Sequence, residues 1–175
     1  MKSTYLVIKR CIAVSCVLAL AAGSIIAGGI PKPLRTRFVV GDPVWRELPI
    51  RSDFQSKYDK TWQTAVNTIL ENNFDVATMD KESGYLRTTW NEGVVALNGN
   101  WAYKVQVSLK LVYTPADPRA NPPTVPVVEK VRVQVAGELT QVDMRRRKIA
   151  AAFRGYDQVL LQNLFQDLQG KLGAR

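Results

Sequence analysis

Residues 103–113 read YKVQVSLKLVY, and every second residue of this stretch, from Tyr103 to Tyr113, is apolar. The residues between them are mostly polar and include Lys104 and Lys110. Such alternation predicts a strand with one packed face and one face in water. This pattern is typical of antiparallel sheets, in which a single face is commonly buried.

A second stretch with the same alternation, residues 127–139, follows the proline-rich connection 115–126. Its valines at every second position are predicted to point inward, whereas Lys130 and Arg132 point toward water. The two stretches are the longest strands that the sequence predicts.

A helix and a hairpin precede these strands. Apolar residues recur at spacings of three and four over residues 56–73, which predicts an amphipathic helix. Residues 74–79 and 85–90 are predicted to form two short strands. The turn between them ends at Gly84, which supplies a positive φ.

A second helix is predicted near the C-terminus, over residues 156–171, from its stripe of leucines. Residues 91–100 are interpreted as a loop, and residues 144–155 as a basic loop with at most one helical turn. The fold class is therefore α+β, a two-layer sandwich in which two helices cover an antiparallel sheet of about four strands.

The N-terminal segment predicts export from the cytoplasm. Lys9 and Arg10 are followed by about twenty residues without charge, 11–30, which is typical of a signal peptide or signal anchor. We assign residues 1–27 to this segment. Residues 28–55 are expected to be an extended, proline-rich arm with one short strand near 36–40, and residues 56–175 the α+β domain.

Three fates remain open for the N-terminal segment. The small residues at 21–23, or a later site near Ala27, suit cleavage by signal peptidase. The apolar run is also long enough to stay in the membrane as an anchor. Alternatively, residues 13–16 (AVSC) resemble a lipobox, in which Cys16 is the lipidated residue. Each fate places the domain on the periplasmic side of the cell envelope.

Composition excludes several kinds of catalytic site. The chain has no histidine, and its two cysteines, Cys11 and Cys16, both lie in the N-terminal apolar segment. Zinc sites with His or Cys ligands and Ser-His-Asp or Cys-His sites are therefore excluded from the domain. No glycine-rich phosphate motif is present, and Glu129 and Glu138 form no recognisable pair of catalytic acids. We expect a protein that is not an enzyme and uses no cofactor or metal.

The formal charge of +9 suits an acidic partner or an anionic surface, and clusters of basic and aromatic residues are the candidate contact sites. The run 145–148 is the densest group of charges, either a solvated loop or a contact for anionic headgroups or an acidic partner. Basic residues on the wet face either prevent aggregation or dock a partner. Two tryptophans beside the loop 91–100 are candidates for exposed interface residues. The candidate contacts are Arg145, Arg146, Arg147, Lys148, Trp90, Trp101, Lys104, Lys110, Lys130 and Arg132.

Residues 58–90 resemble a known family. The predicted helix carries Tyr58, Trp62 and further apolar residues. The hairpin that follows it contains Phe74-Asp75-Val76, Gly84-Tyr85-Leu86 and Thr88. This pattern is similar to the helix-grip domain of the outer-membrane assembly lipoprotein C (NlpB-like) family and of similar small envelope lipoproteins. The family has two such domains and a clear lipobox, whereas this chain has room for one domain. The resemblance implies a helix-grip-like fold and a non-catalytic accessory role in an envelope complex.

The sequence therefore predicts an exported accessory or structural subunit that binds protein partners in a membrane-associated assembly. Its expected partners are envelope proteins, and the membrane itself if the N-terminal segment or a lipid is retained. Nucleic acid is not an expected partner, because the domain is exported. The alternative is a periplasmic carrier that holds a lipid or small ligand between its helices and its sheet.

Overall fold

The computed structural model describes residues 30–96, 100–148 and 152–173. The chain divides into two compact units, residues 1–36 and 37–175. The described part of the first unit holds most of helix α2 (Lys32–Arg37). Within the described ranges, no helix is long and apolar enough to cross a membrane. The predicted signal peptide or anchor, residues 1–27, and Cys16 lie outside the described residues.

The second unit is an α+β domain built on an eight-stranded antiparallel sheet. The strand order is β1-β8-β7-β6-β4-β3, and β2 also pairs with β7 and β5 with β6. Its elements in chain order are β1 (Phe38–Val40), β2 (Arg46–Pro49), α3 (Ser52–Gln55), α4 (Tyr58–Glu71), β3 (Val76–Asp80), β4 (Tyr85–Thr88), β5 (Asn91–Ala96), β6 (Asn100–Thr114), β7 (Val127–Val142), β8 (Phe153–Asp157) and α5 (Gln158–Leu172).

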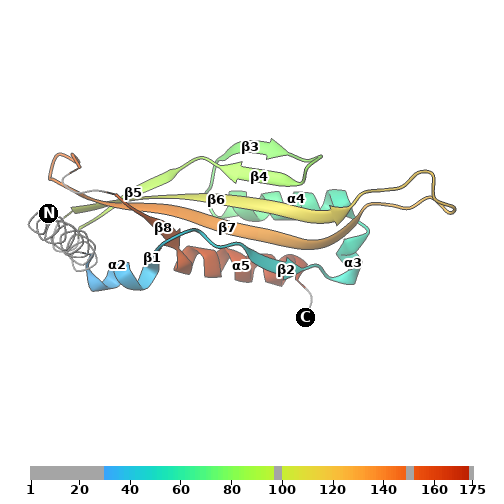
Figure 1. Ribbon diagram of the computed structural model, residues 1–175, viewed down its shortest axis with the longest axis horizontal. Helices are drawn as coiled ribbons and strands as arrows, with labels where there is room; N and C mark the ends of the chain where they lie inside the picture. Colours follow the sequence, from blue (N-terminus) through green and yellow to red (C-terminus); the bar gives the residue numbers. More distant parts are fainter. Residues whose placement is uncertain (1–29, 97–99, 149–151, 174–175) are drawn as a thin grey trace, which may run out of the picture. The chain divides into compact units, whose positions relative to one another are not determined.

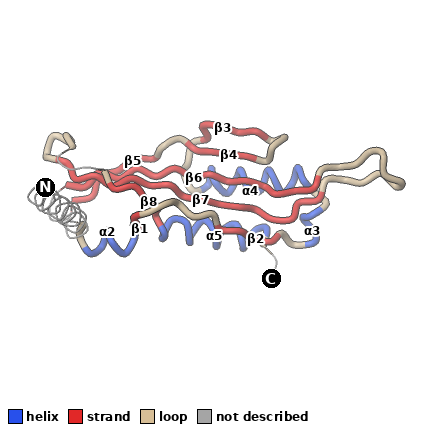
Figure 2. Tube along the Cα trace, in the orientation of Figure 1, coloured by secondary structure: helices blue, strands red, loops and turns tan. Residues whose placement is uncertain are grey.

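The hairpin of β6 and β7 is the centre of the sheet. The two strands run side by side through the domain, and a proline-rich loop joins them (Figure 1). Each outer side of this hairpin is paired with two short strands, one after the other. β5 and β4 pair with β6, and β8 and β2 pair with β7. The colouring by structure type in Figure 2 shows these short strands along the hairpin.

A β-bulge at Glu129 sets the register of the hairpin. Thr114 pairs with Val127 and Tyr113 with Val128, but Val112 pairs with Lys130, so no residue of β6 pairs with Glu129 across the two strands. The backbone carbonyl of Glu129 accepts a hydrogen bond from Ile50 N at 3.1 Å. Its side-chain carboxylate accepts another from the Thr114 hydroxyl at 2.9 Å. The extra residue is therefore held by groups on both sides of β7.

The core lies between one face of the hairpin and the helices α4 and α5. The alternate apolar residues of β6 and β7 are buried together with one side of each helix, as the sequence predicts. Residues of this core that are fully buried include Ile69, Leu109, Leu111, Val131, Val133, Val135, Leu164 and Leu168. Burying one such side chain contributes about 1.5–3 kcal/mol, so this packing fixes which face of the sheet the helices cover.

The predicted fold class is confirmed, but about four strands and two helices are too few. The described residues form eight strands and four helices. The predicted loop 91–100 contains β5, and the predicted basic loop 144–155 contains the start of β8. The predicted arm 28–55 contains two strands, β1 and β2, and two short helices. These strands are short, and they form because the long hairpin offers backbone groups for pairing.

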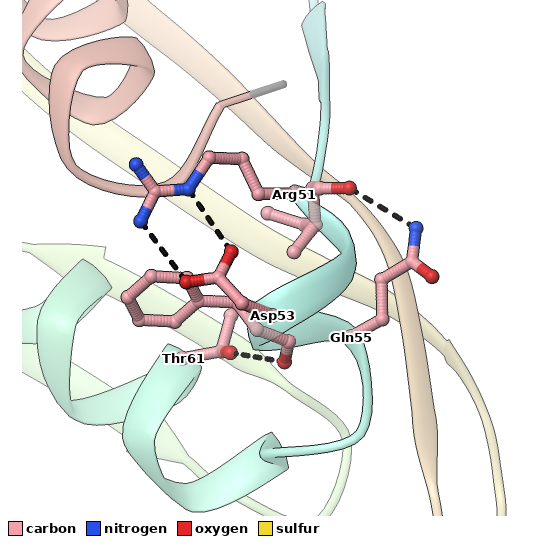
Figure 3. Close-up of polar contacts among 6 residues, drawn as sticks. Arg51, Asp53, Gln55 and Thr61 are labelled. Carbon is pink, nitrogen blue, oxygen red and sulfur yellow. Dashed lines mark hydrogen bonds and ion pairs between the residues drawn. The ribbon is translucent and has the colours of Figure 1, made fainter. Parts of the chain in front are cut away.

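The segment after β2 joins the arm to the C-terminal helix. Arg51 N donates a hydrogen bond to Leu172 O at 3.0 Å, next to the bridge between Ile50 and Gly173. Figure 3 shows the polar contacts of this segment. The Arg51 side chain binds Asp53, and the Gln55 amide donates to Ile50 O at 3.1 Å. The Thr61 hydroxyl donates to Phe54 O at 2.9 Å, which connects α4 to α3.

Two tyrosines hold the turn between β3 and β4. The Tyr58 hydroxyl donates to Lys81 O and the Tyr113 hydroxyl to Glu82 O, and the centres of the two rings lie 4.7 Å apart. Gly84 has φ +68°, as predicted, and a Cβ at this position would lie 3.0 Å from Leu111 O. The turn is therefore packed onto β6 and α4 as well as closed by its own hydrogen bonds.

The Tyr58 contact predicts a pH dependence at alkaline pH. Burial, with added repulsion from Tyr113 and nearby carboxylates, raises the pKa of Tyr58 from 10.0 to about 12. The folded state prefers the protonated phenol. The stability that the Tyr58 phenol contributes is therefore complete below pH 10 and is lost as the pH rises through 12. Replacing Tyr58→Phe is expected to remove a tyrosine transition near pH 12 from an ultraviolet absorbance titration of the phenolate. A titration curve that keeps this transition would assign it to another tyrosine.

Two glycines provide a matched test of the packing. A Cβ at Gly155 would overlap the carbonyl oxygen of Val39, so Gly155→Ala is expected to displace β1 and to destabilise the domain by about 1–3 kcal/mol. Gly170 lies on an exposed turn of α5, and a Cβ there would meet nothing within 4 Å, so Gly170→Ala is expected to stabilise by about 0.5–1 kcal/mol. Chemical denaturation measures both changes, and similar effects from the two variants would contradict this packing.

Candidate functional site

The sheet has one face that neither α4 nor α5 covers, which we call the open face. It consists of the side chains of β6 and β7 that alternate with the buried ones, together with their neighbours on the flanking strands. Most of these side chains are half-buried and polar. The polar side chains of β6 and β7 on this face, of which only that of Lys110 is exposed, are Lys104, Gln106, Ser108, Lys110, Lys130, Arg132, Gln134 and Glu138.

One group of charges on the open face surrounds Glu47. Its carboxylate lies 2.7 Å from Lys130 Nζ and 3.1 Å from Arg132 Nε. The Arg132 contact lacks hydrogen-bond geometry and is a charge pair only. The Arg132 guanidinium also lies 5.6 Å from the ring centre of Trp45, which is 36% exposed. The hydrogen bond from Lys130, more than the charge of Arg132, lowers the pKa of Glu47.

A second group is a row of charges across four strands. The cross-strand pairs place Glu92 beside Lys104, Lys104 beside Glu138, and Glu138 beside Arg154. Lys104 Nζ lies 2.9 Å from one carboxylate oxygen of Glu138, and Arg154 Nε lies 3.6 Å from the other. Lys104 also lies 4.7 Å from the ring centre of Trp90. The charges alternate in sign along the row, so they largely compensate one another.

Lys110 and Arg87 are the open-face cations without such compensation. Both are exposed, and among the described residues neither forms an ion pair. Leu86 is buried opposite Leu109, so Arg87 and Lys110 lie on the open face of adjacent strands. The middle of the open face is therefore positively charged.

The basic run 145–148 forms the turn after β7. Asp143 holds this turn: its carboxylate accepts hydrogen bonds from the amides of Arg145 and Arg147 and from the Arg147 side chain, each at 2.8 Å. These bonds lower the pKa of Asp143, with the Arg147 amide as the largest cause. Arg146 has φ +60°, and Lys148 pairs with Val142 through the backbone.

A hollow of about 510 Å³ lies between this turn and the open face. Arg146 and Lys148 line it from the turn. The charged row contributes Glu92, Lys104 and Glu138, and the next row along the strands contributes Val94, Ala102 and Thr140. The hollow is thus a continuation of the open face at the end of the sheet where β5 lies.

The structure brings most of the predicted contact residues together. Lys104, Lys110, Lys130 and Arg132 lie on the open face, Trp90 lies against Lys104, and Arg146 and Lys148 line the adjoining hollow. Arg145 and Arg147 belong to the same turn but do not line the hollow.

The expectation that Trp101 is exposed is wrong. Trp101 is 2% exposed, and its ring lies 6.4 Å from that of Phe153, centre to centre. Residues 91–96 form β5 rather than a loop, so Trp101 belongs to β6 and continues the alternation of buried residues that includes Val105 and Val107.

Sequence reasoning missed several residues of the open face, chiefly Trp45, Glu47 and Arg87. Leu48 and Ile50 alternate with Glu47 and Pro49, and this short pattern was the available signal for β2. It covers too few residues to distinguish an edge strand from an extended arm. The pairing of Lys104 with Glu138 could not be read from the sequence, because it depends on the register of the hairpin.

Comparison of the chain with protein-family models and with curated protein sequences gives no match. Among the described residues, no group of three or more His, Cys, Asp or Glu side chains is placed to hold a metal ion.

The charge pairs of Glu47 predict a pH dependence in acid. Because its pKa in the folded protein is below the ordinary value of 4.5, Glu47 contributes stability that is present above pH 4.5 and is lost as the pH falls. Glu47→Gln is expected to lower the free energy of unfolding at neutral pH and to make it less dependent on pH below 4.5. Urea denaturation at a series of pH values measures both effects. A curve that coincides with that of the wild type would show that Glu47 contributes nothing, and a lower but parallel curve would show that its contribution does not depend on its titration.

Proposed function

We propose that this protein is an exported, non-catalytic accessory subunit that binds an acidic protein partner through the open face of its sheet. The observation that carries the proposal is the asymmetry of the sheet. Two helices cover one face, while the other presents cations and two half-exposed tryptophans, Trp45 and Trp90.

The composition of the open face supports a protein partner. Tryptophan and arginine are the residues that most often dominate the binding energy of protein interfaces. On this face Glu47 positions Arg132 and Glu138 positions Lys104, each beside an indole ring. Side chains held in this way lose less conformational freedom on binding. Lys110 and Arg87 add uncompensated positive charge between them, which favours an acidic partner.

The proposed non-catalytic role rests on the sequence and on the ion pairs that the carboxylates form. The chain has no histidine, and its cysteines lie in the N-terminal segment. On the open face, Glu47 and Glu138 are each paired with two cations, an arrangement that suits structural ion pairs.

The cellular location is part of the same proposal. The basic residues Lys9 and Arg10 and the uncharged run 11–30 support export to the periplasmic side of the envelope, with membrane attachment if the segment or a lipid on Cys16 is retained. The resemblance to the helix-grip domain of the outer-membrane assembly lipoprotein C family supports an accessory role in a membrane-associated assembly.

A periplasmic carrier of a lipid or small ligand remains the alternative. A carrier of this kind needs an apolar cavity between the helices and the sheet. In this region the inward-facing side chains of β6, β7, α4 and α5 form one cluster of buried residues, and the hollow beside the turn 143–148 lies on the opposite face. Native mass spectrometry that finds a lipid bound to the purified protein would favour the carrier.

Photo-crosslinking in the native envelope tests the partner proposal. A photoreactive amino acid at position 110, on the open face, is expected to form a stoichiometric crosslink to one protein, which mass spectrometry identifies. The same amino acid at Lys57, the exposed residue that precedes α4 on the helix side, is the matched control and is expected to give no such product.

Charge reversal then tests the chemistry of the identified complex. Lys110→Glu and Arg87→Glu are each expected to weaken binding about tenfold or more, with the loss decreasing as salt is added, because both place like charges against an acidic surface. Lys57→Glu is expected to leave the affinity unchanged. If reversal at 57 weakens binding as much as reversal at 110, the partner does not dock on the open face.

A further inference from the structure

We propose that the hollow beside the turn 143–148 binds a small phosphorylated molecule, with its phosphate held by Arg146 and Lys148. This site lies beyond the docking surface argued above, and it is tested with residues that the docking test leaves unchanged. Its volume of about 510 Å³ lies in the range of small-ligand sites, about 300–1,000 Å³.

The charge of the hollow points to an anion. The row of Glu92, Lys104, Glu138 and Arg154 alternates in sign across four strands and largely compensates itself. Arg146 and Lys148 are outside this row, and among the described residues neither side chain forms an ion pair or a hydrogen bond. The hollow therefore has two cations available for a ligand.

The backbone of the turn that carries these cations is ordered before any ligand binds. Asp143 accepts three hydrogen bonds from Arg145 and Arg147, and its own amide donates to Arg147 O at 2.9 Å. The backbone on both sides of Arg146 is thereby fixed. Because the backbone is fixed in advance, binding a ligand orders only the two side chains and not the turn itself.

Two features favour a phosphate that carries a small hydroxylated skeleton. A guanidinium forms paired hydrogen bonds with phosphate oxygens, and an ammonium adds a second positive charge to match a dianion. Next to these cations the floor is Ala102 and Thr140, whose small side chains leave room for a few carbon atoms. Glu92, on the far strand of the row, has no ion-pair partner among the described residues and is an acceptor for hydroxyl groups.

A phosphate on a hydroxylated carbon skeleton occurs both in free polyol phosphates, which are dianions, and in the headgroups of glycerophospholipids, whose phosphodiesters carry one negative charge. Calorimetric titration with glycerol 3-phosphate at physiological ionic strength is expected to show one site per chain. Inorganic phosphate is expected to bind more weakly, because it lacks the carbon skeleton and hydroxyls that contact the floor. Sedimentation with phosphatidylglycerol vesicles, compared with phosphatidylcholine vesicles, shows whether a lipid headgroup also enters the site.

Two kinds of variant separate this site from general charge attraction. Arg146→Asn keeps a residue that tolerates positive φ and is expected to weaken glycerol 3-phosphate binding about tenfold or more, as is Lys148→Gln. Arg145→Asn changes the same charge outside the hollow and is expected to leave the affinity unchanged. Ala102→Phe fills the hollow without changing any charge and is expected to abolish binding.

The results that would overturn the site are equally defined. Absence of any saturable binding of glycerol 3-phosphate to the wild-type protein would exclude it. Equal weakening by Arg145→Asn and Arg146→Asn would show a diffuse basic surface, and full binding by Ala102→Phe would place the ligand outside the hollow. Binding to phosphatidylglycerol vesicles that Arg146→Asn abolishes would support the site and identify a headgroup as one source of the phosphate.

Discussion

The register of the β6–β7 hairpin is the constraint on which the rest of the domain depends. Residues paired directly across two strands lie on the same face of a sheet. Next to the connecting loop, Thr114 pairs with Val127. If this register continued along the hairpin, each apolar residue of β6 would pair with a polar residue of β7, and the two would lie on the same face. The bulge at Glu129 shifts the pairing by one residue. Beyond it Leu111 lies beside Val131 and Leu109 beside Val133, so a single apolar face forms.

The same shift creates the open face. Once the apolar residues of both strands share one side, their polar neighbours share the other, and Lys110 lies beside Arg132 and Lys104 beside Glu138. The flanking strands then complete each group, because β2 brings Glu47 next to Arg132 and β5 brings Glu92 next to Lys104. The packing of the core and the arrangement of surface charges are therefore two results of one extra residue.

The sequence predicts the elements that depend on neighbouring residues better than those that depend on pairing between residues far apart in the chain. Alternation along residues 103–113 and the leucine stripe near the C-terminus are local patterns, and both elements form as expected. The strands β1, β5 and β8 have three to six residues each, and their pairing with distant residues decides their conformation. Trp101 was misplaced for this reason, whereas Lys104 was placed on the correct face because its own strand shows the pattern.

The division of each side of the hairpin between two short strands bears on the solubility of the protein. A long strand with unpaired backbone groups is a template for adding further chains, and extended hydrophobic edges of this kind promote fibrils. Here the longest strands, β6 and β7, are in the interior of the sheet, and β3, one of the strands at its margin, has only five residues. Loss of β2 through mutation or proteolysis would uncover part of β7, which is rich in valine, and loss of β5 would uncover the first residues of β6. The short margin strands thus protect the chain from self-association as well as completing its charged surface.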